Sequence, residues 1–199
     1  MSTPTHYVVI DLEATCCDDY TIPRHEMEII EIGAVLVSGE GHAAVDEFQS
    51  FVRPVRHPVL TPFCTGLTSI TQADVEAAPE FRAVFERLTG WIASHPAPHV
   101  FCSWGDYDRT QFQRDCAFHG IPYALPQRHV NLKRAFSERL GTSRKFGMAG
   151  ALAQAGLPLA GTHHRGIDDA RNIARLLPFA LGADGAGARG AIDEAPRAP

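Results

Sequence analysis

The order of apolar segments predicts an α/β domain built on a mixed, five-stranded sheet flanked by helices. Three strand-like segments come first, at residues 6–12, 28–37 and 45–52, and their short connections favour antiparallel pairing. Two more, at residues 100–102 and 129–132, are interleaved with helical patterns. Strands first and helices interleaved later are typical of a mixed sheet in a single α/β domain.

Helices are expected after the third strand. Residues 54–71 are rich in Pro and Thr and indicate a loop with a short helix near residues 62–66. Apolar residues then recur in steps of three and four, which predicts an amphipathic helix with Pro79 in its first turn. Three further helices are predicted, at 108–119 before Gly120, at 146–155 before Gly156, and at 167–177 with an end at Pro178 or shortly after.

The chain of 199 residues has room for one full-sized domain, which we place at residues 1–182. Residues 183–199 consist of Ala, Gly, Pro, Asp, Glu and Arg with a single Ile, so we expect a disordered tail. No apolar run reaches the length of about eighteen residues that a membrane helix needs. The N-terminus lacks the pattern of a secretion signal, and we expect a cytoplasmic protein.

The five cysteines are odd in number and contain no C-x-x-C pair. This spacing argues against a disulfide scaffold and against a structural zinc site. We therefore expect reduced thiols in a reducing compartment.

Charge is distributed unevenly around a net value of −5. Residues 1–50 carry ten acidic side chains against Arg24 alone, a net of −9, whereas residues 128–145 carry six basic side chains against Glu138, a net of +5. An acidic site for divalent cations beside a basic strip for phosphates fits this pattern. An ordinary solvated surface fits it equally well.

Asp11 and Glu13 stand at the end of the first predicted strand. Side chains two residues apart share one face of a strand, so the two carboxylates should converge. A hard divalent cation such as Mg²⁺ or Mn²⁺ would relieve their repulsion. Alternatively, both residues lie beyond the strand in solvent, because D-x-E pairs also arise by chance.

Two further clusters of polar residues follow predicted structural boundaries. Asp106 and Asp108 open the helix after the fourth strand, where an aspartate is often only a helix cap. The last predicted helix is preceded by His163 and His164 and begins with two aspartates. A histidine that titrates near neutral pH suits a general base, although surface histidines beside a capping aspartate are an equally ordinary arrangement.

Taken together, these clusters resemble the DEDDh 3′→5′ exonucleases of the DnaQ-like, ribonuclease-H-related superfamily. Within it, the chain is similar to the enhanced-RNA-interference exonucleases and to bacterial relatives named as sporulation-kinase inhibitors. The resemblance covers roughly residues 6–180. It rests on the segments DLEATC (11–16), EIIEIGAV (28–35), FVRP (51–54), LTPFCTGLTSITQADV (60–75), SWGDYD (103–108) and HRGIDDARNIARL (164–176).

The resemblance implies a set of site residues. Its register favours His164 over His163 and Asp169 over Asp168, and it favours Asp108 over Asp106. The implied catalytic set, with His164 as general base and the four acids as metal ligands, is Asp11, Glu13, Asp108, His164 and Asp169. Residues implied to border the substrate are Leu12, Ala14, Thr15, Trp104 and His164, and candidates for holding upstream phosphates are Arg144 and Lys145.

The function implied is hydrolysis of the 3′ end of RNA, and also of single-stranded DNA, with release of nucleoside 5′-monophosphates. Two cations, Mg²⁺ or Mn²⁺, would be the cofactors. Single-stranded nucleic-acid 3′ ends would be the partners, with RNA favoured and with no membrane partner. One alternative is a regulatory member of the fold that acts on a signalling kinase pathway. Another is a phosphatase or nucleotide hydrolase with the same metal ligands.

Overall fold

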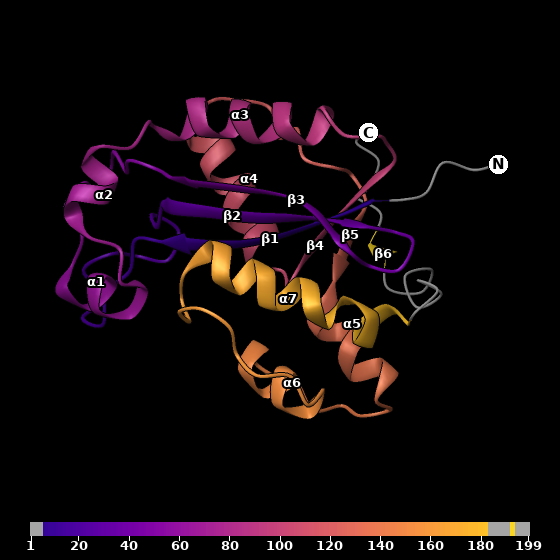
Figure 1. The fold of residues 1–199 in the computed structure, drawn as a ribbon. Helices are drawn as coiled ribbons and strands as arrows, with labels where there is room; N and C mark the ends of the chain where they lie inside the picture. The colour runs from indigo at the N-terminus through magenta and orange to yellow at the C-terminus, as the bar shows by residue number, and fades with distance from the viewer. Residues whose placement is uncertain (1–5, 183–191, 194–199) are drawn as a thin grey trace.

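A mixed sheet forms the centre of the computed structural model, which describes residues 6–182 and 192–193. Its strands lie in the order β3-β2-β1-β4-β5-β6 (Figure 1). Their bounds are β1 His6–Ala14, β2 Ile29–Ser38, β3 Ala44–Phe51, β4 His99–Ser103, β5 His129–Asn131 and β6 Ile192–Asp193.

Strand β1 lies inside the sheet because its backbone pairs on both sides. It is antiparallel to β2 along its whole length and parallel to β4 over residues 6–9 only. Strand β3 continues the antiparallel half beyond β2, and β5 continues the parallel half beyond β4. The predicted antiparallel strands at the start of the chain are therefore confirmed. The part of β1 beyond Val9 has no ladder partner on the β4 side.

Strand β6 adds to the five strands that the sequence predicts. Ile192–Asp193 lies inside the segment expected to be a disordered tail, yet it pairs antiparallel with residues 129–130 of β5. The outer edge of β5 offers unpaired backbone groups that a short extended segment can satisfy. The rest of the expected tail, residues 183–191 and 194–199, lies outside the described residues.

Helices cover both faces of the sheet (Figure 1). The described residues form α1 Pro62–Thr68, α2 Gln72–Glu76, α3 Phe81–Ala93, α4 Tyr107–Phe118, α5 Leu132–Arg139, α6 Met148–Gln154 and α7 Gly166–Leu181. Helices α3 and α4 pack with Val8, Ile10 and Leu12 of β1 in one apolar cluster. Helices α5, α6 and α7 pack with Tyr7 and Val9 in another, on the opposite face of the strand.

The start of α3 differs from the prediction, whereas the end of α7 agrees with the predicted end at Pro178 or shortly after. Helix α3 begins at Phe81, and Pro79 precedes it, where the Pro79 carbonyl accepts a hydrogen bond from the Arg53 N–H at 2.9 Å. Helix α7 continues through Pro178 to Leu181. A proline in a last turn removes only one intrahelical hydrogen bond, and the flanking apolar face is buried, so packing keeps the turn helical.

Helices α2 and α5 have no counterpart in the prediction. Helix α2 is five residues long and begins with a capping box between Thr71 and Asp74. Helix α5 follows β5 without a loop, and the Asn131 side chain caps it by accepting the Arg134 N–H at 2.9 Å. Neither helix is long enough to show a clear periodicity in the sequence.

The five cysteines are free thiols, as their spacing predicts. Among the described residues, no helix is both long and apolar enough to cross a lipid bilayer.

Candidate active site

Asp11 and Glu13 project from the face of β1 that α7 covers. Odd-numbered residues of β1 point to that side, because Tyr7 and Val9 pack against α7. Glu13 is 8% exposed, and Asp11 is partly buried. Ligand oxygen atoms of Asp11, Glu13 and Asp169 all lie within 4.8 Å of one another. The structure therefore brings together three of the four acidic residues singled out in the sequence.

Asp169 reaches this face because α7 begins in direct contact with β2. A Cβ atom added to Gly33 would lie 2.1 Å from the carbonyl carbon of Gly166, so only glycine permits this approach. Gly33 pairs with Asp11 in the sheet, which places the first turn of α7 beside the β1 carboxylates. Asp169 lies in that first turn and is buried.

The buried carboxylate of Glu31 stabilises the same contact between β2 and the start of α7. Its oxygen atoms accept the Gly166 N–H at 2.9 Å and the Arg165 guanidinium at 3.1 and 3.3 Å. Glu31 is 0% exposed and faces Glu13 across the β1–β2 ladder. The Arg165 ion pair compensates the cost of burying this charge so close to the other acids.

Asp108 approaches β1 from α4. It lies in the first turn of that helix, is 4% exposed, and accepts the Leu12 N–H at 3.2 Å. This hydrogen bond occupies the side of β1 that β4 leaves unpaired beyond Val9. Asp108 is thereby held next to the backbone between Asp11 and Glu13.

Asp106 and Asp168, the two aspartates that the family register disfavours, form hydrogen bonds within the protein. Asp106 is exposed at the N-terminus of α4 and accepts the Asn131 side-chain amide at 2.8 Å. Asp168 accepts the Thr162 N–H at 2.9 Å and lies outside the carboxylate cluster. Both placements agree with the register that favours Asp108 and Asp169.

Burial and mutual repulsion dominate the electrostatics of the cluster. Burial, then the charges of Asp108, Glu13 and Asp169, raise the pKa of Asp11 well above its ordinary value. Burial, then the charge of Asp169, raises the pKa of Glu13 to about 8. Burial also raises the pKa of Asp108 to about 7, against the opposing effect of its backbone hydrogen bonds. A divalent cation bound among these oxygens would favour the ionised forms, so the donor set fits a hard cation.

Two histidines lie beside Asp169. The Nδ1 atom of His163 is 2.9 Å from an Asp169 carboxylate oxygen, and the His164 N–H donates to the same oxygen at 3.0 Å. The two imidazole rings stack with their centroids 4.0 Å apart. His164 adopts a left-handed φ of 64°, which turns the chain just before α7. Burial, then the neighbouring His163, lowers the pKa of His164, so its imidazole is neutral at pH 7.

The residues predicted to border a nucleotide are largely buried. Leu12, Ala14 and Thr15 are 5%, 6% and 1% exposed, and the Thr15 hydroxyl accepts the Glu28 N–H. Their side chains therefore belong to the packed interior, and their contact with a nucleotide stays a prediction. Trp104 is partly buried against the α5–α7 cluster.

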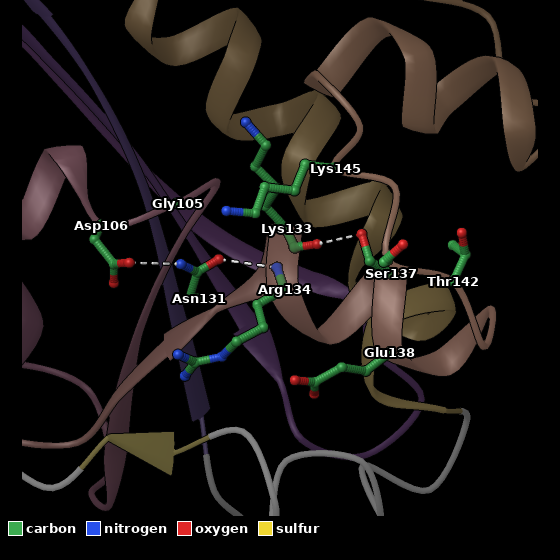
Figure 2. A pocket seen from close by; sticks show the side chains of 10 residues that line it. Gly105, Asp106, Asn131, Lys133, Arg134, Ser137, Glu138, Thr142 and Lys145 are labelled. Atoms are coloured by element: carbon green, nitrogen blue, oxygen red, sulfur yellow. Dashed lines mark hydrogen bonds between the residues drawn. The ribbon is translucent and has the colours of Figure 1, made fainter.

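Arg144 and Lys145, the predicted phosphate contacts, differ in their surroundings. The Arg144 guanidinium carbon lies 4.8 Å from the centre of the Phe146 ring. Lys145 lines a cavity of about 460 Å³ beside the start of α4, together with Lys133 and Asn131 (Figure 2).

Sequence reasoning missed Glu31 and Gly33 as residues that build the site. Both interrupt the apolar run of β2, and a charge or a glycine inside a buried strand is the signal that could have identified them. The partner that each requires, the start of α7, is more than 130 positions away along the chain.

Residues 8–177 match a family described as Exonuclease (RNase_T). ERI1 exoribonuclease 3 of Homo sapiens is 36% identical over 179 residues, which cover 86% of this chain and 52% of that protein. The 3′-5′ exoribonuclease 1 of Rattus norvegicus is 30% identical over 175 residues, which cover 84% of this chain and 50% of that protein. The chain thus spans about half the length of these curated relatives.

Solved structures agree with this match. The nuclease domain of 3′hExo, a DEDDh family member bound to rAMP, has a TM-score of 0.80 at 27% identity and covers 88% of this chain and 90% of that one. A 3′-exonuclease structure concerned with histone mRNA stem-loop recognition has a TM-score of 0.80 at 26% identity, covering 88% and 81%. This likeness confirms the predicted ribonuclease-H-like fold. Because the family match spans nearly all of the folded residues, the chain belongs to the Exonuclease (RNase_T) family.

Proposed function

We propose that the protein is a metal-dependent 3′→5′ exonuclease that removes nucleoside 5′-monophosphates from the 3′ end of RNA. The observation that carries this proposal is the convergence of Asp11, Glu13 and Asp169, with ligand atoms within 4.8 Å, beside two histidines. The relatives with the names exoribonuclease 1 and exoribonuclease 3 favour RNA over DNA as the substrate.

The carboxylates provide a metal site of the kind that phosphodiester hydrolysis uses. Two cations, Mg²⁺ or Mn²⁺, would supply positive charge to the oxygens of the scissile phosphate and of the leaving group. Asp11, Glu13 and Asp169 would hold the cations directly, and Asp108 would assist through a water molecule. Oxygen ligands throughout are typical of hard cations.

His164 would accept the proton of the attacking water. Its lowered pKa keeps the imidazole neutral at pH 7, which is the form that a general base requires. The attacking oxygen becomes part of the released monophosphate, and the shortened strand keeps a new 3′-hydroxyl. The contact between β2 and α7, which Gly33, Glu31 and Gly166 form, would orient Asp169 and the histidines during this step.

An activity panel tests the proposal directly. Single- and double-stranded RNA and DNA carrying a 5′ label are incubated with the protein and Mn²⁺ or Mg²⁺, with EDTA as the metal-free control. We expect progressive shortening of single-stranded RNA from its 3′ end, and block of this shortening by a terminal 3′-phosphorothioate linkage. Asp11→Asn should lower the activity about a hundredfold or more, because it removes a charged ligand from the proposed cation site.

Absence of shortening on every polymer would end the proposal, as would equal rates for the wild type and Asp11→Asn. Shortening of DNA alone would retain the exonuclease and reject RNA as its substrate.

A further inference from the structure

Both lysines of the chain line one cavity. The sequence contains two lysines and sixteen arginines, and the lysines are Lys133 and Lys145. The cavity of about 460 Å³ is bordered by both of them and by Gly105, Asp106 and Asn131 (Figure 2). Lys133 comes from the first turn of α5, and Lys145 comes from the loop between α5 and α6. The fold thus brings together cations from two separate elements.

Hydrogen bonds hold the two lysines in place relative to each other. The buried Ser137 hydroxyl lies 3.1 Å from the Lys133 carbonyl oxygen and 2.8 Å from the Arg144 carbonyl oxygen. It therefore links α5 to the loop one residue before Lys145. The Thr142 N–H also donates to the Ser137 carbonyl at 3.1 Å. The loop that carries Lys145 is therefore held against α5 by hydrogen bonds.

A second link ties this wall to the candidate active site. The Trp104 indole N–H donates to the Phe146 carbonyl at 3.1 Å, which joins the residue after Lys145 to the residue before Gly105. The chain then runs from Gly105 into α4, whose first turn holds Asp108 against β1. The cavity therefore opens beside the segment that positions one of the four acids.

The ammonium groups of both lysines are available to a ligand. Among residues 6–182, neither group takes part in a hydrogen bond or an ion pair. Figure 2 draws both ammonium groups toward the Gly105 side of the cavity, and it draws the Arg134 guanidinium and the Glu138 carboxylate on another side. Asp106 also borders the cavity, and its carboxylate accepts the Asn131 side-chain amide at 2.8 Å. Two lysines on one cavity favour an anionic ligand, and an ammonium group binds phosphate as a point charge.

We infer that this cavity binds an internucleotide phosphate of the single strand, upstream (5′) of the linkage that is cleaved. The inference rests on the proposed function and gives it a second contact point on the substrate. Lys133 and Lys145 supply the charge, whereas Arg144 is occupied with the Phe146 ring. A contact with a phosphate does not recognise the base, so it increases affinity for long substrates without sequence preference.

The test compares two substrates that differ in upstream phosphates. One is a 12-nucleotide uridylate RNA, and the other is the p-nitrophenyl ester of thymidine 5′-monophosphate, which has none. For Lys133→Gln/Lys145→Gln we expect KM on RNA to rise roughly tenfold or more, and the slope of log KM against log salt to fall by about 0.7, the value for loss of one phosphate contact on a single strand. Turnover of the ester should be unchanged.

Matched variants separate charge from structure. Lys133→Arg/Lys145→Arg keeps both charges and should retain the wild-type KM. Arg87→Gln, on the exposed side of α3 across the sheet, removes one charge elsewhere and should leave KM on RNA unchanged. Replacement of single phosphates by neutral methylphosphonates should raise KM for the wild type at one upstream linkage, and that effect should vanish in the double glutamine variant.

An unchanged KM on RNA in the double glutamine variant overturns the inference. An equal loss on the ester also overturns it, because the lysines would then act in the reaction itself. Reductive ¹³C-methylation gives each lysine its own resonance, and both should shift when the RNA is added to the Asp11→Asn protein. This binding readout stays valid even if the wild type cleaves no polymer, so failure of the proposed function remains distinguishable.

Discussion

His163 and His164 are adjacent in sequence and stacked in space, yet they contact Asp169 in different ways. The His163 ring contacts Asp169, whereas His164 contacts the same carboxylate through its backbone N–H and leaves its ring uncommitted to it. The assignment of the base to His164 therefore rests on the register of the family motif, and the contact between the His163 ring and Asp169 makes His163 the alternative to be tested.

Replacing each histidine separately tests this difference. His164→Ala should lower turnover by about 10²- to 10⁴-fold, the usual contribution of a general base. Affinity for Mn²⁺, measured by calorimetry, should stay near that of the wild type. His163→Ala should lower turnover much less. A larger loss for His163→Ala than for His164→Ala would transfer the base assignment to His163.

For single residues of the candidate site, the sequence predicts the residue types better than their surroundings. The D-x-E pair, Asp108 and Asp169 all carry the carboxylates that the site brings together or holds at β1. The burial of Thr15 was not predictable, because it depends on segments that pack against β1 from elsewhere in the chain.

Among the elements, the contact between β2 and the start of α7 decides where the acids meet. The two backbones approach so closely at Gly33 and Gly166 that no side chain fits between them. Glu31 then fixes the orientation of α7 through the Gly166 N–H. The strand and the helix act as one support for Asp169.

Gly33→Ala should therefore damage both the fold and the site. The added methyl group meets backbone atoms that cannot move aside, so we expect the free energy of unfolding to fall by at least about 1–3 kcal/mol. Urea denaturation measures this change, and calorimetry with Mn²⁺ should show weaker binding because Asp169 is displaced.

Gly90→Ala is the matched control, since an added Cβ at Gly90 meets nothing within 4 Å on helix α3. It should be neutral or stabilising by up to about 1 kcal/mol. Equal effects of the two substitutions would contradict a specific role for the Gly33 contact.

The sequence predicts the strands well and the short helices poorly. Strands β1 to β3 have strong β-branched or alternating patterns, whereas β4 and β5 are recognisable from short apolar runs between turn residues. Helices α2 and α5 begin with side-chain caps and depend on packing for their stability. A pattern based on periodicity cannot detect helices of five or eight residues reliably.

For the whole molecule, we expect the acid cluster to make the free energy of unfolding depend on pH and on the proposed cations. The pKa of Glu13 is raised to about 8 and that of Asp108 to about 7, so the folded state favours their protonated forms. For groups with a raised pKa, the stabilisation is present at low pH and is lost as pH rises through the folded pKa. A bound cation reverses this preference, because it requires the ionised forms.

In EDTA we expect the melting temperature to fall as pH rises from 6 to 9. Each unit by which the pKa in the folded state exceeds the ordinary pKa lowers the free energy of unfolding at high pH by roughly 1.4 kcal/mol. The increase in melting temperature caused by Mn²⁺ should grow over the same range, as measured by scanning fluorimetry. Asp11→Asn should reduce both effects. A melting temperature in EDTA that is independent of pH would contradict this account of the cluster.

The role of individual acids could not be separated from the sequence, because ten of them lie in residues 1–50. Only Asp11 and Glu13 of this group contribute to the carboxylate cluster with Asp169. The buried Glu28 accepts the N–H groups of residues 55–57 and shapes the loop before α1. Charge counts along the chain therefore mix the candidate metal site with acids that organise the backbone.

The placement of both lysines in one cavity has a practical consequence for handling the protein. Amine-directed chemistry, such as coupling to an activated bead or labelling with an ester dye, reaches side chains only at Lys133 and Lys145, in addition to the terminal amine. A bead coupled there would block the cavity, whereas a thiol or terminal tag would leave it open. Immobilisation by the two routes should therefore yield preparations that differ in how well they capture RNA.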